Sequence, residues 1–238
     1  MSTPTALDSF LDKWRQRWPE WAVAEVFVPQ EGRDRVVAWF ALLQEFDDIL
    51  NIAGDPLPAD AKLGWWATEL SDWAGQRSRH PLGRILQPVP APWERLAAAL
   101  PDLVAARARA ADPQAAVVAL ERYATAVAEV EAVVLDGRAA QPRQLATQVL
   151  AQRLSEVGQA AVPLSLLDGD GGTAAAERAQ RDWARALLDG WPARIAGPRP
   201  RRIWAALARG RLRPQAAGKR VAASPVGILW TAWRAARG

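Results

Sequence analysis

Two adjacent carboxylates lie in a stretch that otherwise has the pattern of a buried helix. Asp47 and Asp48 fall within residues 40–51, where large apolar side chains recur at helical spacing. One face of such a helix carries four polar side chains: Gln44, Asp47, Asp48 and Asn51. Burying two like charges costs free energy unless a divalent cation, an arginine or water offsets it. We therefore expect the pair to face a cavity, where it either binds a cation or pairs with an arginine such as Arg33.

The composition excludes several kinds of catalytic chemistry. The chain has no cysteine, so it has neither a disulfide framework nor a thiolate metal site. With a single histidine, His80, most histidine-based catalysis and zinc binding are also excluded. Chemistry would have to come from carboxylates, arginines, hydroxyl groups or Tyr123. We interpret His80, in a His-Pro turn, and Tyr123, in the middle of a helix, as packing residues.

Positive charge is concentrated at the end of the chain. The last acidic residue is Asp189, and residues 190–238 contain ten Arg and one Lys, although the formal charge of the whole chain is only +4. This basic segment, which also holds Trp204, Trp230 and Trp233, either faces an anionic membrane or packs on the acidic remainder of the chain. Nucleic acid is not expected as a partner, because the segment has no recognised binding module.

The N-terminal residues carry charges every few positions and have no uninterrupted apolar core, so no signal peptide is predicted. No apolar run approaches the ~20 residues that a membrane span needs. We expect a cytoplasmic protein, soluble or peripheral on the inner face of the membrane.

Helical periodicity and capping residues predict an all-α fold with one domain over residues 1–238. The expected helices cover 5–18, 31–52, 58–77, 80–86, 93–110 with a break near Pro101, 113–135, 142–167 with a kink at Pro163, 173–188, 202–212 and 224–236. Loops are expected at 168–172 and 197–201. Only residues 23–28 have the pattern of a strand. The short connections favour antiparallel neighbours in one bundle.

Several motifs occur in an order that resembles the squalene/phytoene synthase family, the head-to-head branch of the all-α isoprenoid synthases. They are PQEGR at 29–33, the aspartate-rich WFALLQEFDDILN at 39–51, LGWWATEL at 63–70, HPLGRIL at 80–86, LDGRAAQ at 135–141 and KRVAASPVGILWTAWRA at 219–235. Each motif alone is weak, but their order and spacing together are specific.

The resemblance implies a site for Mg²⁺ and for prenyl diphosphates. Its metal ligands would be Asp47, Asp48 and Asn51, where the family has a further aspartate. The diphosphate would meet Arg33 and the position of Gln44, where the family has arginine. The tryptophans at 65, 66 and 73 either belong to the core or line a prenyl pocket.

The second metal-binding motif of the family, an Asn-x-x-Arg-Asp stretch followed by another aspartate, is missing. By order we expect its remnant near residues 185–192, with Asp189 as the ligand that is left. The resemblance therefore implies a non-catalytic member that binds a prenyl or lipid-like ligand or a protein partner, as family members that act as assembly factors do. The alternative is an active Mg²⁺-dependent prenyltransferase that condenses two allylic diphosphates.

Overall fold

The computed structural model describes residues 5–167, 172–219 and 223–238, and these residues form helices and no strands. The loop predicted at 168–172 lies outside the described residues except for Gly172. The α-helices are α1 (Ala6–Arg17), α2 (Trp21–Ala24), α3 (Arg33–Leu50), α4 (Leu57–Ala74), α5 (Gly83–Leu86), α6 (Trp93–Ala99), α7 (Pro101–Arg107), α8 (Pro113–Val118), α9 (Glu121–Val134), α10 (Pro142–Val157), α11 (Thr173–Asp189), α12 (Arg199–Ala216) and α13 (Pro225–Arg237). The predicted all-α fold of the isoprenoid synthase type is confirmed.

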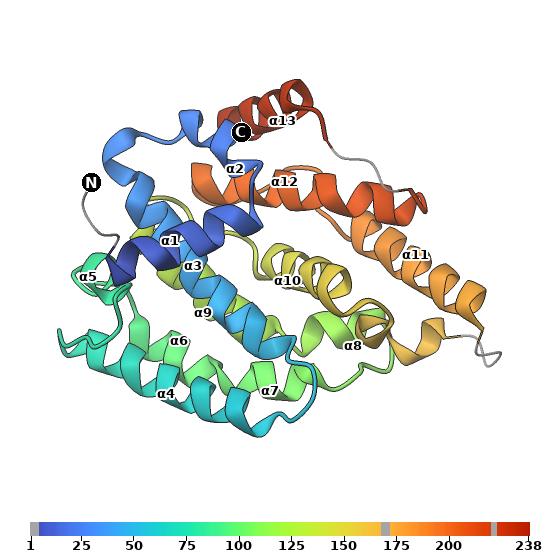
Figure 1. Cartoon of the computed structure of the whole chain (residues 1–238), viewed down its shortest axis with the longest axis horizontal. Helices are drawn as coiled ribbons and strands as arrows, with labels where there is room; N and C mark the ends of the chain where they lie inside the picture. The colour runs from blue at the N-terminus through green and yellow to red at the C-terminus, as the bar shows by residue number, and fades with distance from the viewer. Residues whose placement is uncertain (1–4, 168–171, 220–222) are drawn as a thin grey trace.

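The aspartate-rich helix α3 lies at the centre of the fold (Figure 1). It packs against α1, α4, α5, α7, α9 and α10. Apolar residues surround it on almost every side, so even Gln44, Glu45 and Asp47 are buried. The predicted apolar positions of this helix, from Val36 to Leu50, are all buried. The helix predicted over residues 31–52 is therefore buried among its neighbours along most of its length.

Helix α1 covers the outer edge of α3. Thr5 caps its first turn: the Thr5 side chain accepts from the Asp8 N–H, and the Asp8 carboxylate accepts from the Thr5 N–H. The apolar stripe of α1 buries Trp14 against Phe40 of α3, with ring centroids 5.5 Å apart. This packing turns the basic side of α1 toward the carboxylates of α3.

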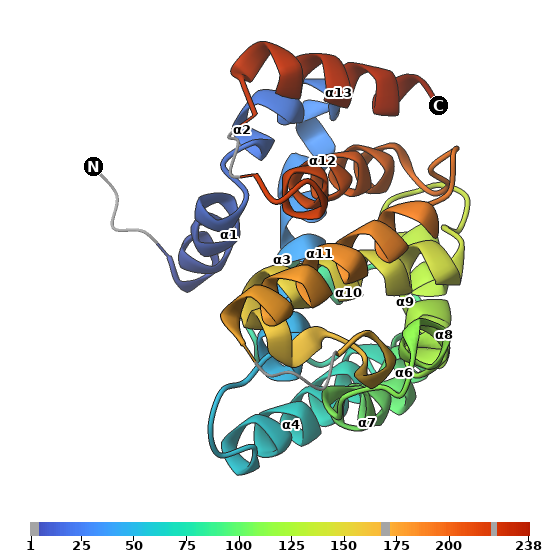
Figure 2. The same cartoon turned by 90° about the vertical axis from the view of Figure 1, so that its right-hand side faces the viewer.

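The C-terminal helices stack beyond α10. Helix α12 packs on α10, α11 and α13, and α13 also contacts α2. In both views α13 lies at one end of the molecule and α4 at the other (Figures 1 and 2). Within the described residues, no helix is both long enough and apolar enough to cross a membrane.

Several predicted elements differ from the structure, among them the helix expected over 80–86, of which only Gly83–Leu86 is an α-helix. The helix expected over 113–135 is interrupted between α8 and α9, where the backbone of buried Leu120 leaves the helical region. The helix expected over 142–167 ends at Val157, because Gly158 takes a positive φ of 54° that favours glycine. The strand pattern at 23–28 is wrong: these residues complete α2 and a 3₁₀ turn at Glu25–Phe27.

Some of the predicted caps and loops are confirmed and others are wrong. The helices that begin after Asp112 and Ser224 have the predicted caps, with each side chain accepting a backbone N–H. Thr173, in contrast, is the first residue of α11 rather than its cap. The loop expected at 197–201 is shorter, because Pro200 fits the first turn of α12 and the helix begins at Arg199.

Candidate functional site

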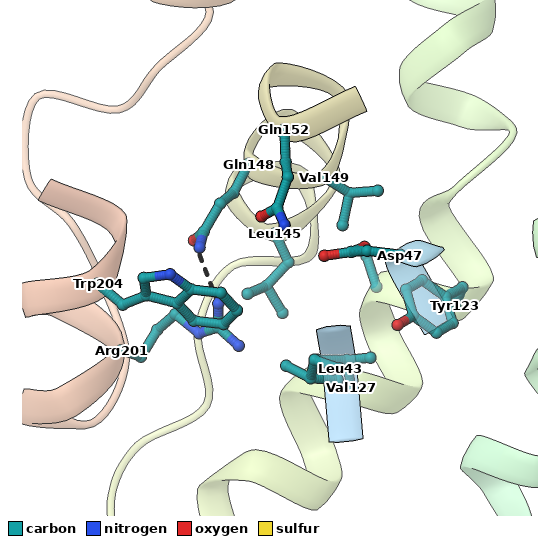
Figure 3. A pocket seen from close by; sticks show the side chains of 11 residues that line it. Leu43, Asp47, Tyr123, Val127, Leu145, Gln148, Val149, Gln152, Arg201 and Trp204 are labelled. Carbon is teal, nitrogen blue, oxygen red and sulfur yellow. Dashed lines mark hydrogen bonds between the residues drawn. The ribbon is translucent and has the colours of Figure 1, made fainter. Parts of the chain in front are cut away.

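Asp47 lies at a small buried cavity in the centre of the fold. The cavity has a volume of about 20 Å³. Its lining comes from α3, α9, α10 and α12: Leu43, Asp47, Tyr123, Ala124, Val127, Leu145, Gln148, Val149, Gln152, Arg201 and Trp204. Figure 3 shows Asp47 and Tyr123 on one side of this space and Arg201 with Trp204 on the other. We expected the pair to face a cavity: Asp47 lines this one, whereas Asp48 does not.

The environment of Asp47 favours its neutral form. Burial raises its pKa from the ordinary 3.8 to about 8, and the negative charges of Asp48 and Glu156 act in the same direction. Arg201 and Arg17 oppose this shift only in part. No hydrogen bond to the Asp47 carboxyl is found in the described part of the chain. The protonated acid is thus the expected form at neutral pH.

Asp48 belongs instead to an ion-pair network at the edge of α3. It lies 3.3 Å from the Nζ of Lys13 and 3.3 Å from a guanidinium nitrogen of Arg17. Arg17 also pairs with Glu156 on α10. The Gln44 amide donates to Asp48 at 3.0 Å. Lys13 and Arg17 of α1 therefore lie beside Asp48, where a metal ion would otherwise supply the positive charge.

The helix that faces Asp47 and Asp48 is α10, which differs from the prediction. The Gln152 amide of α10 donates to the Gln44 side-chain oxygen of α3 at 2.8 Å. Asp189, which we expected on the facing helix, is instead exposed at the end of α11. On α10, the only acid at the spacing of the Asn-x-x-Arg-Asp motif and its further aspartate is Glu156, within residues 148–156. There the chain has Gln148, Ala151, Gln152 and Glu156. The motif was missed because its asparagine and first aspartate positions hold glutamine and its arginine position holds alanine.

Asn51, the third predicted ligand, is engaged by a buried arginine. Arg153 of α10 donates to the Asn51 side-chain oxygen at 3.2 Å and to the Leu50 carbonyl at 2.8 Å. Its other guanidinium nitrogen donates to the Arg107 carbonyl at 2.7 Å. Arg153 thereby satisfies carbonyls at the C-terminal ends of α3 and α7. The oxygen of Asn51 is directed at a cation of the protein.

Arg33 lies far from the carboxylates that it was expected to serve. It begins α3, and 14 residues of helix separate it from Asp47, about 21 Å at 1.5 Å per residue. Its Nε donates to the Val28 carbonyl at 3.1 Å. The structure therefore does not bring Arg33 to Asp47, either as an ion-pair partner or beside a diphosphate there.

A buried ion pair that the sequence did not indicate adjoins the cavity. The Arg201 Nε donates to the Glu131 carboxylate at 2.8 Å, and the Trp39 Nε1 donates to the same carboxylate at 2.8 Å. Arg201 also donates to the Gln148 side-chain oxygen at 3.2 Å. Its guanidinium lies over the ring of Trp204, 4.6 Å from the centroid. Arg201 was missed because nothing in its local sequence distinguishes it from the other arginines of the basic segment.

The other candidate residues have structural roles. His80 packs on Phe10 and Trp66, each with ring centroids 4.5 Å from its own, and its Nδ1 accepts from the Leu82 N–H at 3.2 Å. Burial lowers the pKa of His80. Tyr123 is buried beside Asp47, and burial raises its pKa well above the usual value. Trp66 and Trp73 are core residues, and Trp65 is partly exposed.

The donors around Asp47 do not fit Mg²⁺, which the resemblance implies. Mg²⁺ needs several charged oxygens in near-octahedral geometry. Here Asp48 and Glu156 share Arg17, while Asp47 favours its protonated form. Across the described residues, no group of three Asp, Glu or His side chains is placed to hold a metal ion. The family's metal chemistry is therefore not supported by this set of side chains.

Comparison with known proteins supports one assignment. No curated protein matches the chain. The model of the family described as squalene/phytoene synthase matches residues 19–164, more than half of the chain. The match includes both α3 and α10, the two helices that meet at Asp47, and it ends before Asp189. The chain therefore belongs to the squalene/phytoene synthase family.

Proposed function

We propose that this chain is a non-catalytic member of the squalene/phytoene synthase family, which binds a lipid-like ligand or a protein partner. The observation that carries the proposal is the size of the cavity at Asp47. A cavity of about 20 Å³ has room for one water molecule. Pockets for small organic ligands are typically ~300–1,000 Å³. A prenyl chain of fifteen or more carbons therefore has no room there.

The chemistry of the side chains supports the same proposal. Ionisation of an allylic diphosphate needs positive charge beside the anionic leaving group. Metal ions supply several kcal/mol of that stabilisation. In this chain, Arg17 and Lys13 are held by Asp48, Glu45 and Glu156. Gln44 and Gln152 bond to each other rather than presenting charges. The facing helices thus hold each other through internal contacts.

A surface groove beside the buried cavity has the size of a ligand site. It lies between α1, α10 and α12, has a volume of about 600 Å³, and shares Gln152 with the buried cavity. Its lining combines apolar Trp18 and Pro214 with Lys219 and with two ion-paired side chains, Arg211, which pairs with Glu20, and Glu156, which pairs with Arg17. An amphiphile with an apolar chain and an anionic head would match this combination. We place the lipid-like ligand of the proposal in this groove.

The alternative, an active prenyltransferase, is tested directly. The purified chain is incubated with farnesyl or geranylgeranyl diphosphate and Mg²⁺, and the extract is analysed for C30 and C40 hydrocarbons. We expect no product. Formation of a product that is lost in Asp47→Ala and retained in Asp189→Ala would overturn the proposal. Asp189→Ala is the matched control because Asp189 is exposed and lies outside the family match.

Binding in the surface groove is tested separately from turnover. Farnesyl diphosphate is titrated in the presence of a chelator, and binding is followed by calorimetry. We expect binding that weakens in Lys219→Gln and persists in Arg84→Gln, an exposed control on α5. If both variants bind farnesyl diphosphate equally well, the ligand does not bind in this groove.

A further inference from the structure

A second groove, between α12 and α13, is lined by arginines. It has a volume of about 460 Å³. Its cationic side chains are Arg194, Arg202, Arg209, Arg213, Arg234 and Arg237. Among the residues that the structure describes, no acidic side chain lines it. This groove goes beyond the proposed function, because it lies on the C-terminal helices and shares no residue with the cavity at Asp47.

In the described part of the chain, no acidic side chain neutralises the arginines of this groove. Two other arginines of α12 do reach the acidic part of the chain, since Arg201 pairs with Glu131 and Arg211 pairs with Glu20. For the six arginines of the groove, no ion pair is found with any residue that the structure describes. The expectation that the basic segment packs on an acidic body therefore applies to Arg201 and Arg211 but not to the groove.

Positive charges crowd one another inside the groove. Burial lowers the pKa of Arg209, and the neighbouring charge of Arg213 lowers it further. The Nε of Arg209 is buried and has no hydrogen-bond partner in the described structure. Arg202 has a structural role, because it donates to the carbonyls of Ala235 and Ala236 and so holds the end of α13. An anion in the groove would relieve the repulsion and offer acceptors to these donors.

An exposed apolar stripe runs along α13 beside the groove. It consists of Val226, Leu229, Trp230 and Trp233, which recur at helical spacing. Trp230 is 56% exposed and Val226 is 77% exposed. The opposite face of α13 buries Ile228 and Ala232. Both views place this helix at the outer end of the molecule (Figures 1 and 2).

Two arginine–tryptophan pairs stack where the stripe meets the groove. The Arg234 guanidinium lies 4.7 Å from the Trp230 ring centroid, and Arg237 lies 4.7 Å from that of Trp233. Tryptophan is enriched at the headgroup level of membranes, where its ring is apolar and its N–H is polar. Cationic side chains beside an apolar stripe are typical of helices that lie in the plane of a membrane surface.

We propose that α13 and the arginine groove form a docking surface for a membrane that contains anionic phospholipid. The apolar stripe enters the boundary between headgroups and acyl chains, and the arginines of the groove bind lipid phosphates. Nucleic acid would satisfy the arginines, but it would leave the exposed Val226 and Leu229 without a partner. The combination of charge and apolar stripe is what selects a lipid surface.

The test is sedimentation of the full chain with lipid vesicles. Phosphatidylcholine vesicles are compared with vesicles that also contain phosphatidylglycerol, at low and at high salt. We expect binding to the anionic vesicles that falls with salt, and little binding to neutral ones. Each arginine near an anionic surface contributes about fivefold in affinity, so Arg234→Gln/Arg237→Gln should weaken binding by ten- to thirtyfold. Both side chains are exposed, so the fold should tolerate their replacement.

Matched controls separate this surface from general positive charge. Arg84→Gln/Arg109→Gln removes the same charge from exposed positions on α5 and after α7, and should bind like the parent chain. Trp230→Ala should weaken binding to vesicles without changing the net charge. Equal binding to neutral vesicles, or equal loss in both arginine pairs, would overturn the proposal. So would full competition by inorganic phosphate at matched ionic strength, or tighter binding to duplex DNA that is unaffected by Trp230→Ala.

Discussion

Arg201 and Glu131 form a buried ion pair between α12 and α9, although 70 residues separate them in the chain. Both side chains are almost completely withdrawn from solvent. The pair is completed by Trp39, which donates to the carboxylate, and by Gln148, which accepts from the guanidinium. It joins the C-terminal half of the chain to the helices that surround α3.

Removing one partner of this pair should destabilise the fold strongly. Arg201→Met leaves the Glu131 carboxylate buried without its cation, which typically costs about 3–5 kcal/mol of unfolding free energy. Replacing both residues, as in Glu131→Leu/Arg201→Met, should cost less than the single change, because no charge is left unpaired. Urea unfolding of the two single variants and the double variant measures this coupling. Additive losses would contradict an interaction between the two residues.

Asp47 should make the stability of the protein depend on pH. Its pKa is about 8 in the folded chain and 3.8 ordinarily, so the folded state holds a proton that the unfolded chain releases above about pH 4. Its stabilising contribution is therefore complete below about pH 4 and is lost as the pH rises toward 8. Asp47→Asn keeps a neutral side chain at every pH. Its free energy of unfolding should therefore rise relative to that of the parent by a few kcal/mol between pH 4 and 8.

Urea unfolding at a series of pH values between 4 and 8 measures the effect of Asp47→Asn. The informative quantity is the difference between parent and variant, since other groups titrate in both. Asp189→Asn is the control, because Asp189 is exposed. Parallel pH profiles for the parent and Asp47→Asn would show that Asp47 titrates normally.

Glu69 should have the opposite dependence on pH. It is fully buried, yet its carboxylate accepts from the N–H groups of Arg79 and His80 at 2.7 and 2.8 Å. Burial alone would raise its pKa, but these bonds, with those from Trp73 and Ser78, lower it from 4.5 to about 2. Its stabilising contribution is therefore present above about pH 4.5 and lost as the pH falls toward 2.

Glu69→Gln removes the charge that anchors the turn at His80. At neutral pH we expect a loss of about 1–3 kcal/mol, the usual effect of weakening buried hydrogen bonds. Because the variant cannot titrate at this position, its disadvantage should shrink between pH 4.5 and 2. Thermal unfolding of parent and variant across this range checks the sign, with the exposed Glu94→Gln as control. A constant difference would argue against the low pKa.

The sequence predicted the aspartate helix well because its burial follows from local pattern. Apolar residues on nearly every side of residues 33–50 require a central position, whatever the neighbours are. Start signals were equally local, as Asp112 and Ser224 show by accepting N–H groups of their own helices. The sequence did not indicate the break before α9. It occurs at Leu120, whose backbone is not helical and whose side chain is buried by residues from other helices.

The site was harder to predict, because its key contacts join distant elements through residues of common types. Gln152 and Gln44 meet across two helices, and neither residue signals a partner in the sequence. The second motif of the family ends in aspartates, so the sequence indicated Asp189 as its remnant and not the glutamines of α10. Arg17 pairs with Asp48 and Glu156, and Arg153 donates to Asn51, but nothing in the local sequence of either arginine indicates these partners.

Arg17 provides a last test, because it holds the position between two facing carboxylates. It lies 3.3 Å from Asp48 and pairs with Glu156 on the opposite helix. Arg17→Met leaves these two acids close to each other without the cation they share. Both are about a quarter to a third exposed, so the loss of stability should be modest, about 1 kcal/mol.

A divalent cation bound between Asp48 and Glu156 should restore the stability that Arg17→Met loses with the guanidinium. Ligand that binds only the folded state raises its stability, so millimolar Mg²⁺ should raise the Tm of Arg17→Met and leave that of the parent unchanged. Arg15→Met, which removes a charge from the same helix near Asp12 and Asp34, is the control. An equal Mg²⁺ effect in parent and variant would show that the carboxylates already accept a metal ion beside Arg17. No effect in either would show that Asp48 and Glu156 are too few ligands, even without their arginine.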